Sequence, residues 1–176
     1  MTTETQEALK ILPNGVVIPT KEFIISIHDS IIEYRKELGK DDPKSIRDEG
    51  LIRHLCDTLT DRMHKYKENH LENALYVATE TFYYIACQHP FTDANKSTAY
   101  VSALAIILVN KSIGSGLKIS QNSIKINFQK DHWFVETPEE VKEIVKLAEG
   151  GEDEIKLKRF IKEFLQKQIG AKNDQK

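Results

Sequence analysis

One short segment of the chain gathers the residue types that phosphate chemistry uses. It runs from His89 to Thr98 with the sequence HPFTDANKST. Pro90 cannot continue a helix and restricts the residue before it. We therefore expect His89 to lie in a loop, with an extended backbone and an imidazole free to act near neutral pH. Phe91 is predicted to anchor this loop to the core.

The second half of the segment predicts an anion site beside a metal ligand. Ala94 to Ser97 fall where a new helix begins, and the first N–H groups of a helix attract phosphate by geometry and dipole. Asp93 offers the oxygen ligand that Mg²⁺ prefers. Lys96 adds a positive charge and Asn95 adds an amide. A base, a metal ligand, an anion site and a cation together predict group transfer from a phosphate ester.

Several of these residue types also have simpler interpretations. A histidine before proline often only shapes a loop, and Asp93 could cap the following helix instead of binding a metal. The pair His28-Asp29 lies on the first predicted helix, where a structural or solvated role is favoured. Three more histidines lack ligand spacing and are predicted to be solvated: His54, His64 and His70.

The elements around the segment are predicted to be helices, which gives an all-α bundle of about six or seven. Apolar residues at spacings of three and four carry this prediction. The predicted ranges are Thr20 to Gly39, Ser45 or Asp48 to Met63, Leu71 to Ile85, Asn95 to Asn110, Thr137 to Gly150 and Glu152 to Ile169. From Ala99 onward the fourth is apolar on nearly every side, which is typical of a buried central helix. Thr137 is predicted to cap the fifth, and residues 117–128 are predicted to form a short hairpin.

The length of 176 residues predicts one domain. We expect a mobile arm over residues 1–19 with a short extended piece at Val16 to Ile18, a helical domain over residues 20–169, and a disordered tail over residues 170–176. The basic residues of the last helix are predicted to be solvated: Lys156, Lys158, Arg159 and Lys162.

Composition excludes some classes of function. A net charge of −2 disfavours a protein that mainly neutralises nucleic-acid phosphates. Cys56 and Cys87 are too few for a disulfide framework and are predicted to be buried free thiols. The longest apolar run, Ala99 to Val109, is about half the length that a bilayer requires, and Met1 to Gln6 is unlike a signal peptide. We therefore expect a soluble, cytoplasmic protein.

The motif HPFTDANKSTA closely resembles the signature of the Fic/Doc family, and its DANK core is nearer the Doc (death-on-curing) branch. Flanking segments are similar to the same family's helices: IHDSIIEYR at 27–35, IRDEGLIRHL at 46–55, and AEGG followed by FIKEFL between 148 and 165. The resemblance covers about residues 20–168 and implies a Fic/Doc-like helical bundle.

The resemblance also implies roles for the motif residues. His89 would be the general base that takes a proton from a Ser, Thr or Tyr hydroxyl of a target protein. Asp93 would hold Mg²⁺. The nucleotide phosphates, with ATP as co-substrate, would be held by Ala94, Asn95, Lys96 and the position of Ser97. Fic-type members transfer AMP and Doc-type members transfer a phosphate.

Ser97 departs from the family, which normally has arginine at this position, and Tyr100 does not supply the second arginine of many AMP-transferring members. Lys111 and Lys118 are candidate substitutes if the fold brings them close. On this interpretation Ser97→Arg should restore a bidentate phosphate contact and raise transfer. Residues 45–50 fit the Ser-xxx-Glu-Gly pattern of a self-inhibitory helix, but a chance match is favoured because position 97 has no arginine to block.

Two classes of function stay open. One is a transferase that acts on a target protein, and the other is a catalytically degenerate relative that binds a nucleotide or a protein. An antitoxin-like inhibitor and a homodimer are candidate partners, whereas nucleic acid and membrane are not expected.

Overall fold

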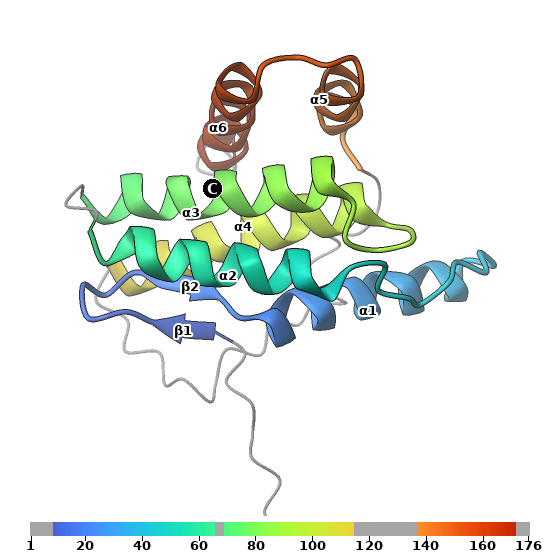
Figure 1. Cartoon of the computed structure of the whole chain (residues 1–176), viewed down its shortest axis with the longest axis horizontal. Coiled ribbons are helices and arrows are strands. Elements are labelled where there is room, and N and C mark those ends of the chain that lie inside the picture. Colours follow the sequence, from blue (N-terminus) through green and yellow to red (C-terminus); the bar gives the residue numbers. More distant parts are fainter. Residues whose placement is uncertain (1–8, 66–68, 115–136, 172–176) are drawn as a thin grey trace, which may run out of the picture.

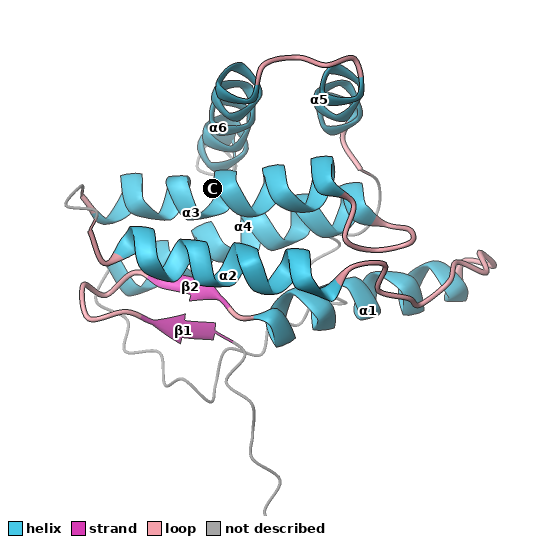
Figure 2. Cartoon of the chain, in the orientation of Figure 1, coloured by secondary structure: helices cyan, strands magenta, loops and turns pink. Residues whose placement is uncertain are grey.

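The computed structural model describes residues 9–65, 69–114 and 137–171, which form six helices and one two-stranded sheet (Figures 1 and 2). The helices are α1 (Lys21–Glu37), α2 (Glu49–Met63), α3 (His70–Gln88), α4 (Asn95–Gly114), α5 (Glu139–Glu149) and α6 (Glu154–Ala171). The predicted all-α fold class is confirmed. The hairpin predicted over residues 117–128 lies outside the described residues.

Helix α4 lies at the centre of the bundle and packs along α3 (Figure 1). Between Thr98 and Asn110 only Tyr100 and Leu108 are partly exposed, so the prediction of a buried central helix is confirmed. By length and composition α4 could cross a membrane, but 61% of its most apolar window is buried inside the protein. The core helix of a globular bundle has this character.

An N-terminal hairpin completes the core: its second strand contains most of the predicted extended piece, whereas its first strand falls in the range expected to be a mobile arm. Strand β1 (Leu9–Ile11) pairs antiparallel with β2 (Val17–Pro19), shown in magenta in Figure 2. Val16 and Val17 have no exposed surface. Residues 9–19 therefore belong to the packed domain, because their β-branched side chains bury apolar surface against the bundle.

Four of the described helices begin with a side-chain cap, and α5 does not; in α6 the cap is Asp153, which accepts from Lys156 N at 3.1 Å. Thr20, Asp48 and Asn69 accept a hydrogen bond from a backbone N–H at the start of α1, α2 and α3. Helix α5 follows Pro138 with no such bond. The prediction that Thr137 caps this helix is therefore wrong: its hydroxyl lies 2.8 Å from Ser97 Oγ instead.

Ion pairs join α6 to α3. Lys158 Nζ lies 2.9 Å from both carboxylate oxygens of Glu80, whose side chain is only 7% exposed. Lys162 pairs with Glu72 at 2.7 Å. The prediction of a solvated basic face is therefore wrong for Lys158, which neutralises a buried carboxylate. Lys162 forms an ion pair but is 41% exposed, and Lys156 and Arg159 are exposed as predicted.

The two cysteines are free, and each is only partly exposed. Burial raises the pKa of the Cys56 thiol to about 12 and that of the Cys87 thiol to about 11. Both are therefore protonated and unreactive near neutral pH. The prediction of free thiols is confirmed, although neither residue is fully buried.

Candidate active site

The loop between α3 and α4 is held to the core by Phe91 and closed by Asn95. Phe91 is 1% exposed, so its predicted role as an anchor is confirmed. Asn95 Oδ1 accepts a hydrogen bond from Phe91 N at 3.0 Å, and Asn95 Nδ2 donates to Phe91 O at 2.8 Å. The Asn95 amide thus satisfies both backbone groups of Phe91 and holds the loop in shape.

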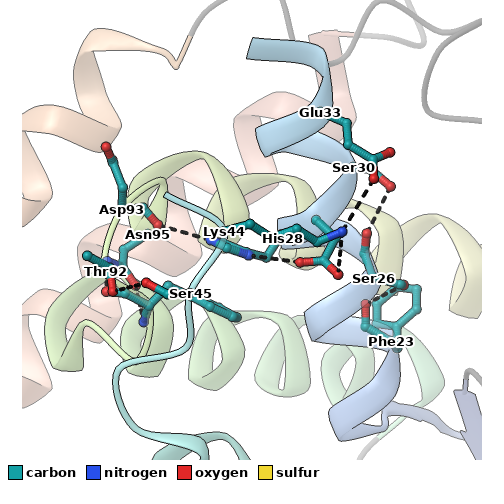
Figure 3. A network of polar contacts seen from close by, with 12 residues as sticks. Phe23, Ser26, His28, Ser30, Glu33, Lys44, Ser45, Thr92, Asp93 and Asn95 are labelled. Carbon is teal, nitrogen blue, oxygen red and sulfur yellow. Dashed lines mark hydrogen bonds and ion pairs between the residues drawn. The ribbon is translucent and has the colours of Figure 1, made fainter. Parts of the chain in front are cut away.

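His28 of α1 packs against the same loop. Its ring stacks on Phe91 with centroids 3.9 Å apart and an interplanar angle of 5°. Its Nε2 lies 3.3 Å from the carbonyl oxygen of Asp93 (Figure 3). A carbonyl can only accept, so this contact requires the ring proton on Nε2, and the Asp29 carboxylate, 3.4 Å from Nδ1, is the competing acceptor. Burial lowers the pKa of His28, and the neighbouring Asp29 offsets part of this effect.

Because the pKa of His28 is lowered, the stability of the folded protein should depend on pH in the acidic range. The unfolded chain binds the proton more tightly than the folded one, so we expect the free energy of unfolding to fall as the pH drops from above 6.5 through the folded pKa. Urea denaturation between pH 8 and pH 5 should show a smaller loss of stability in His28→Gln than in the wild type. His64→Gln, at an exposed position, is the control. Parallel pH curves for wild type and His28→Gln would contradict the assignment.

His89 follows the last residue of α3, with φ 51° and ψ 60°. This left-handed conformation corrects the extended one that we expected. Pro90 excludes the right-handed helical region for His89, and the left-handed region both avoids that clash and ends the helix sharply. The side chain is partly exposed, and within the described ranges no group hydrogen-bonds to the imidazole. It is therefore accessible from outside the protein.

The start of α4 has unpaired donors. The first backbone bond of this helix runs from Thr98 N to Ala94 O at 2.9 Å. The N–H groups of Asn95, Lys96 and Ser97 have no acceptor in the part of the chain that the structure describes. Lys96 has no ion-pair partner there either, so donors and a positive charge meet at one helix end.

Asp93 presents a carboxylate beside these donors. Its side chain is 46% exposed, and one oxygen accepts a hydrogen bond from Ala94 N. The carboxylate points away from His28 in Figure 3. Over residues 9–65, 69–114 and 137–171 no group of three His, Cys, Asp or Glu side chains could hold a metal. A single carboxylate suits Mg²⁺ that also binds nucleotide phosphates and water, so the residues fit such an ion.

The segment before α2 pairs with the loop and steadies it. Pro90 O accepts from Arg47 N at 2.8 Å and from Asp48 N at 2.9 Å, while Thr92 N donates to Ser45 O at 3.1 Å. Glu49, the residue after Asp48, pairs with Lys21 at 2.7 Å, and its carboxylate lies 3.5 Å from an Arg53 nitrogen. These contacts give residues 45–50 a structural role, and the chance match to the inhibitory pattern stays a prediction.

Other histidines and one lysine lie away from the loop. His54 and His64 are exposed, as expected, whereas His70 is partly buried, with Nε2 2.9 Å from Asn110 O. Lys111 lies near the far end of α4, about 20 Å along the helix axis from Ser97. Lys111 therefore cannot replace the missing arginine, and Lys118 lies outside the described residues.

A basic residue that the sequence analysis missed does reach Ser97. Arg35 Nη2 of α1 donates to Ser97 Oγ at 3.3 Å, and Arg35 Nη1 lies 3.5 Å from Asp93 Oδ1. Arg35 follows His28 by seven residues, a spacing that puts both on one face of a helix. This spacing could have pointed to Arg35 only if His28 were known to face the loop, and that contact is seen only in the structure.

Comparison with known proteins agrees with this geometry. The model of the Fic/DOC family matches residues 18–107, which include α1, α2, α3, the loop and the first part of α4. The chain belongs to the Fic/DOC family, and the resemblance seen in the motif is thereby confirmed at the family level. Family membership indicates a transferase-type function. Neither a curated protein nor a solved structure matches the chain.

Proposed function

We propose that the protein transfers AMP or a phosphate from Mg²⁺-ATP to a Ser, Thr or Tyr hydroxyl of a target protein, in the cytoplasm. The observation that carries this proposal is the pairing, in one loop, of an accessible imidazole at His89 with free N–H groups at the start of α4. A base and an anion site at the two ends of one anchored loop are suited to phosphoryl or nucleotidyl transfer.

The α4 end of the loop would bind the phosphates. The N–H groups of Asn95, Lys96 and Ser97 donate to phosphate oxygens, and the Lys96 ammonium adds a positive charge. Asn95 contributes its backbone N–H only, since its side chain is already bonded to Phe91. Asp93 would hold the Mg²⁺, which when bound neutralises charge on the phosphates.

His89 would act on the acceptor. It takes the proton of the target hydroxyl as the hydroxyl oxygen forms a bond to phosphorus. The bond from phosphorus to the leaving group breaks in the same step, releasing pyrophosphate if AMP is transferred or ADP if the γ-phosphate is transferred. The imidazole is partly exposed and has no hydrogen-bond partner among the described residues, so its nitrogens can accept this proton.

ATP labelled separately at the α- and γ-phosphates tests the reaction. The protein is incubated with Mg²⁺, each labelled ATP and host lysate as acceptor. Protein label from the α position indicates AMP transfer, and label from the γ position indicates phosphorylation. Absence of label from both, with measurable ATP binding, would favour the alternative of a catalytically degenerate nucleotide-binding protein. Antitoxin-like inhibitors and homodimer formation can then be tested on whichever activity is found.

Lys96→Ala is expected to weaken Mg²⁺-ATP binding by about tenfold, because one positive charge at a phosphate is worth on the order of 1.4 kcal/mol here. Isothermal titration calorimetry measures the change. Lys65→Ala, at an exposed position after α2, is the control and should bind as the wild type does. Equal affinity of Lys96→Ala and wild type would remove Lys96 from the phosphate site.

A further inference from the structure

The guanidinium of Arg35 lies across the N-terminal end of α4, although Arg35 itself belongs to α1. Its Nη1 is 3.5 Å from Asp93 Oδ1, just before the helix, and its Nη2 is 3.3 Å from Ser97 Oγ, in the first turn. It therefore spans the stretch whose backbone N–H groups are unpaired. The side chain is 25% exposed, so a ligand can reach it.

Neighbouring groups fix the orientation of this guanidinium. Asp42, in the loop after α1, accepts a hydrogen bond from Arg35 Nη1 at 3.1 Å and is itself 20% exposed. The Ser97 hydroxyl, which accepts from Nη2, also lies 2.8 Å from Thr137 Oγ1. Because Ser97 Oγ accepts from Arg35, its own proton is available to Thr137. Three segments of the chain thus meet at Ser97 and hold Arg35 in place.

We propose that Arg35 binds the phosphate of the nucleotide at the start of α4, and that the Ser97 hydroxyl orients it. This inference rests on the proposed function. A guanidinium has five N–H donors in a planar arrangement that matches phosphate oxygens. The described contacts of Arg35 involve Nη1 and Nη2, which leaves further donors for an anion. The arginine that the motif lacks at position 97 is, on this view, supplied from another helix.

This proposal gives Ser97 a different role from the one that the sequence suggested. It is a positioning residue for Arg35, not merely the remnant of a lost phosphate ligand. An arginine at position 97 would bring a second guanidinium against the first and remove the hydroxyl that orients it. Like charges in close contact disfavour each other. We therefore expect Ser97→Arg to raise phosphate affinity and transfer only when Arg35 is absent. This replaces the expectation from the sequence that Ser97→Arg would raise transfer in the otherwise wild-type protein.

The test is a double-mutant cycle of Arg35→Gln and Ser97→Arg, in which both ligand binding and transfer are measured. Titration calorimetry measures the affinities for Mg²⁺-ATP and for inorganic tripolyphosphate, and the labelled-ATP assay measures transfer. Arg35→Gln should weaken both ligands at least tenfold. Arg35→Lys, which keeps the charge but not the planar fork, should recover part of this loss. Ser97→Arg alone should give no gain, whereas the same change in the Arg35→Gln background should raise affinity about tenfold.

Control variants separate binding from folding. Arg53→Gln removes an exposed arginine of α2 whose described partner is Glu49, and the variant should bind both ligands as the wild type does. Thermal unfolding reports whether each variant is folded. If Arg35→Gln does not fold, Ser97→Ala removes only the orienting hydroxyl and should still weaken both ligands several-fold.

The outcomes distinguish this inference from the proposed function. Transfer by the wild type with unchanged affinities in Arg35→Gln and Ser97→Ala would overturn the role of Arg35 and leave the transferase intact. Equal gains from Ser97→Arg in both backgrounds would also overturn it, since Arg35 would then not occupy that position. Arg35-dependent binding of tripolyphosphate without any transfer would support the inference and reject the proposed function.

Discussion

His89→Asn is expected to lower the rate of transfer by about 10²–10⁴-fold while leaving Mg²⁺-ATP affinity within about twofold of the wild type. The loss corresponds to the removal of a positioned general base. Asparagine is chosen because His89 has φ 51°, a left-handed conformation that asparagine tolerates better than alanine. The loop should therefore keep its shape, and the loss should be in the proton transfer.

Transfer and binding are measured on the same preparation, with labelled ATP and by titration calorimetry. His64→Asn, in an exposed position at the end of α2, should keep full activity. A His89→Asn protein that is folded and transfers at the wild-type rate would show that another group takes the proton. Loss of ATP binding together with transfer would instead place His89 among the binding residues.

Much of the fold and the position of the site could be predicted from local sequence. The loop lies between α3 and α4 because Pro90 cannot extend α3. Phe91 is buried because it is the large apolar side chain of the segment. The all-round apolarity after Ala99 correctly predicted a central helix. These features depend on residues near one another in the chain, where periodicity and proline geometry are informative.

The contacts of the site could not be predicted in the same way, since they join distant segments. Arg35 and Ser97 are separated by 62 positions, and Thr137 and Ser97 by 40. Which polar group a hydroxyl or guanidinium meets depends on the crossing of whole helices. Thr137 illustrates the problem: its sequence context is that of a helix cap, yet its hydroxyl contacts α4, because a tertiary partner was available.

Asn95 illustrates a second difficulty, because its residue type fits two roles. The sequence suggested an amide that binds phosphate, and the structure shows the side chain bonded to both backbone groups of Phe91. Asn110 makes the same kind of pair at the other end of α4: its Oδ1 accepts from Val17 N at 2.8 Å and its Nδ2 donates to Val17 O at 3.0 Å. One helix thus holds the α3–α4 loop with one asparagine and the N-terminal hairpin with another.

From these two similar pairs of hydrogen bonds we expect Asn95→Ala and Asn110→Ala each to lower the free energy of unfolding by about 2–4 kcal/mol. Each change leaves a buried backbone N–H and C=O without a partner, and each unmade bond costs roughly 1–3 kcal/mol. Asn95 is 8% exposed and Asn110 is fully buried, so water cannot readily replace the amide in either case. Urea denaturation of both variants measures the loss.

The two variants should differ in function even where they agree in stability. At a temperature where both are folded, Asn95→Ala should weaken Mg²⁺-ATP binding at least tenfold and lower transfer further, because the loop that carries His89 and Asp93 loses its closure. Asn110→Ala should bind and transfer as the wild type does, because the hairpin that it holds lies at the other end of α4. Equal functional losses in both variants would mean that general destabilisation, not the shape of the loop, limits activity. Wild-type binding by a folded Asn95→Ala protein would mean that the N–H groups of α4 stay in position without the closed loop.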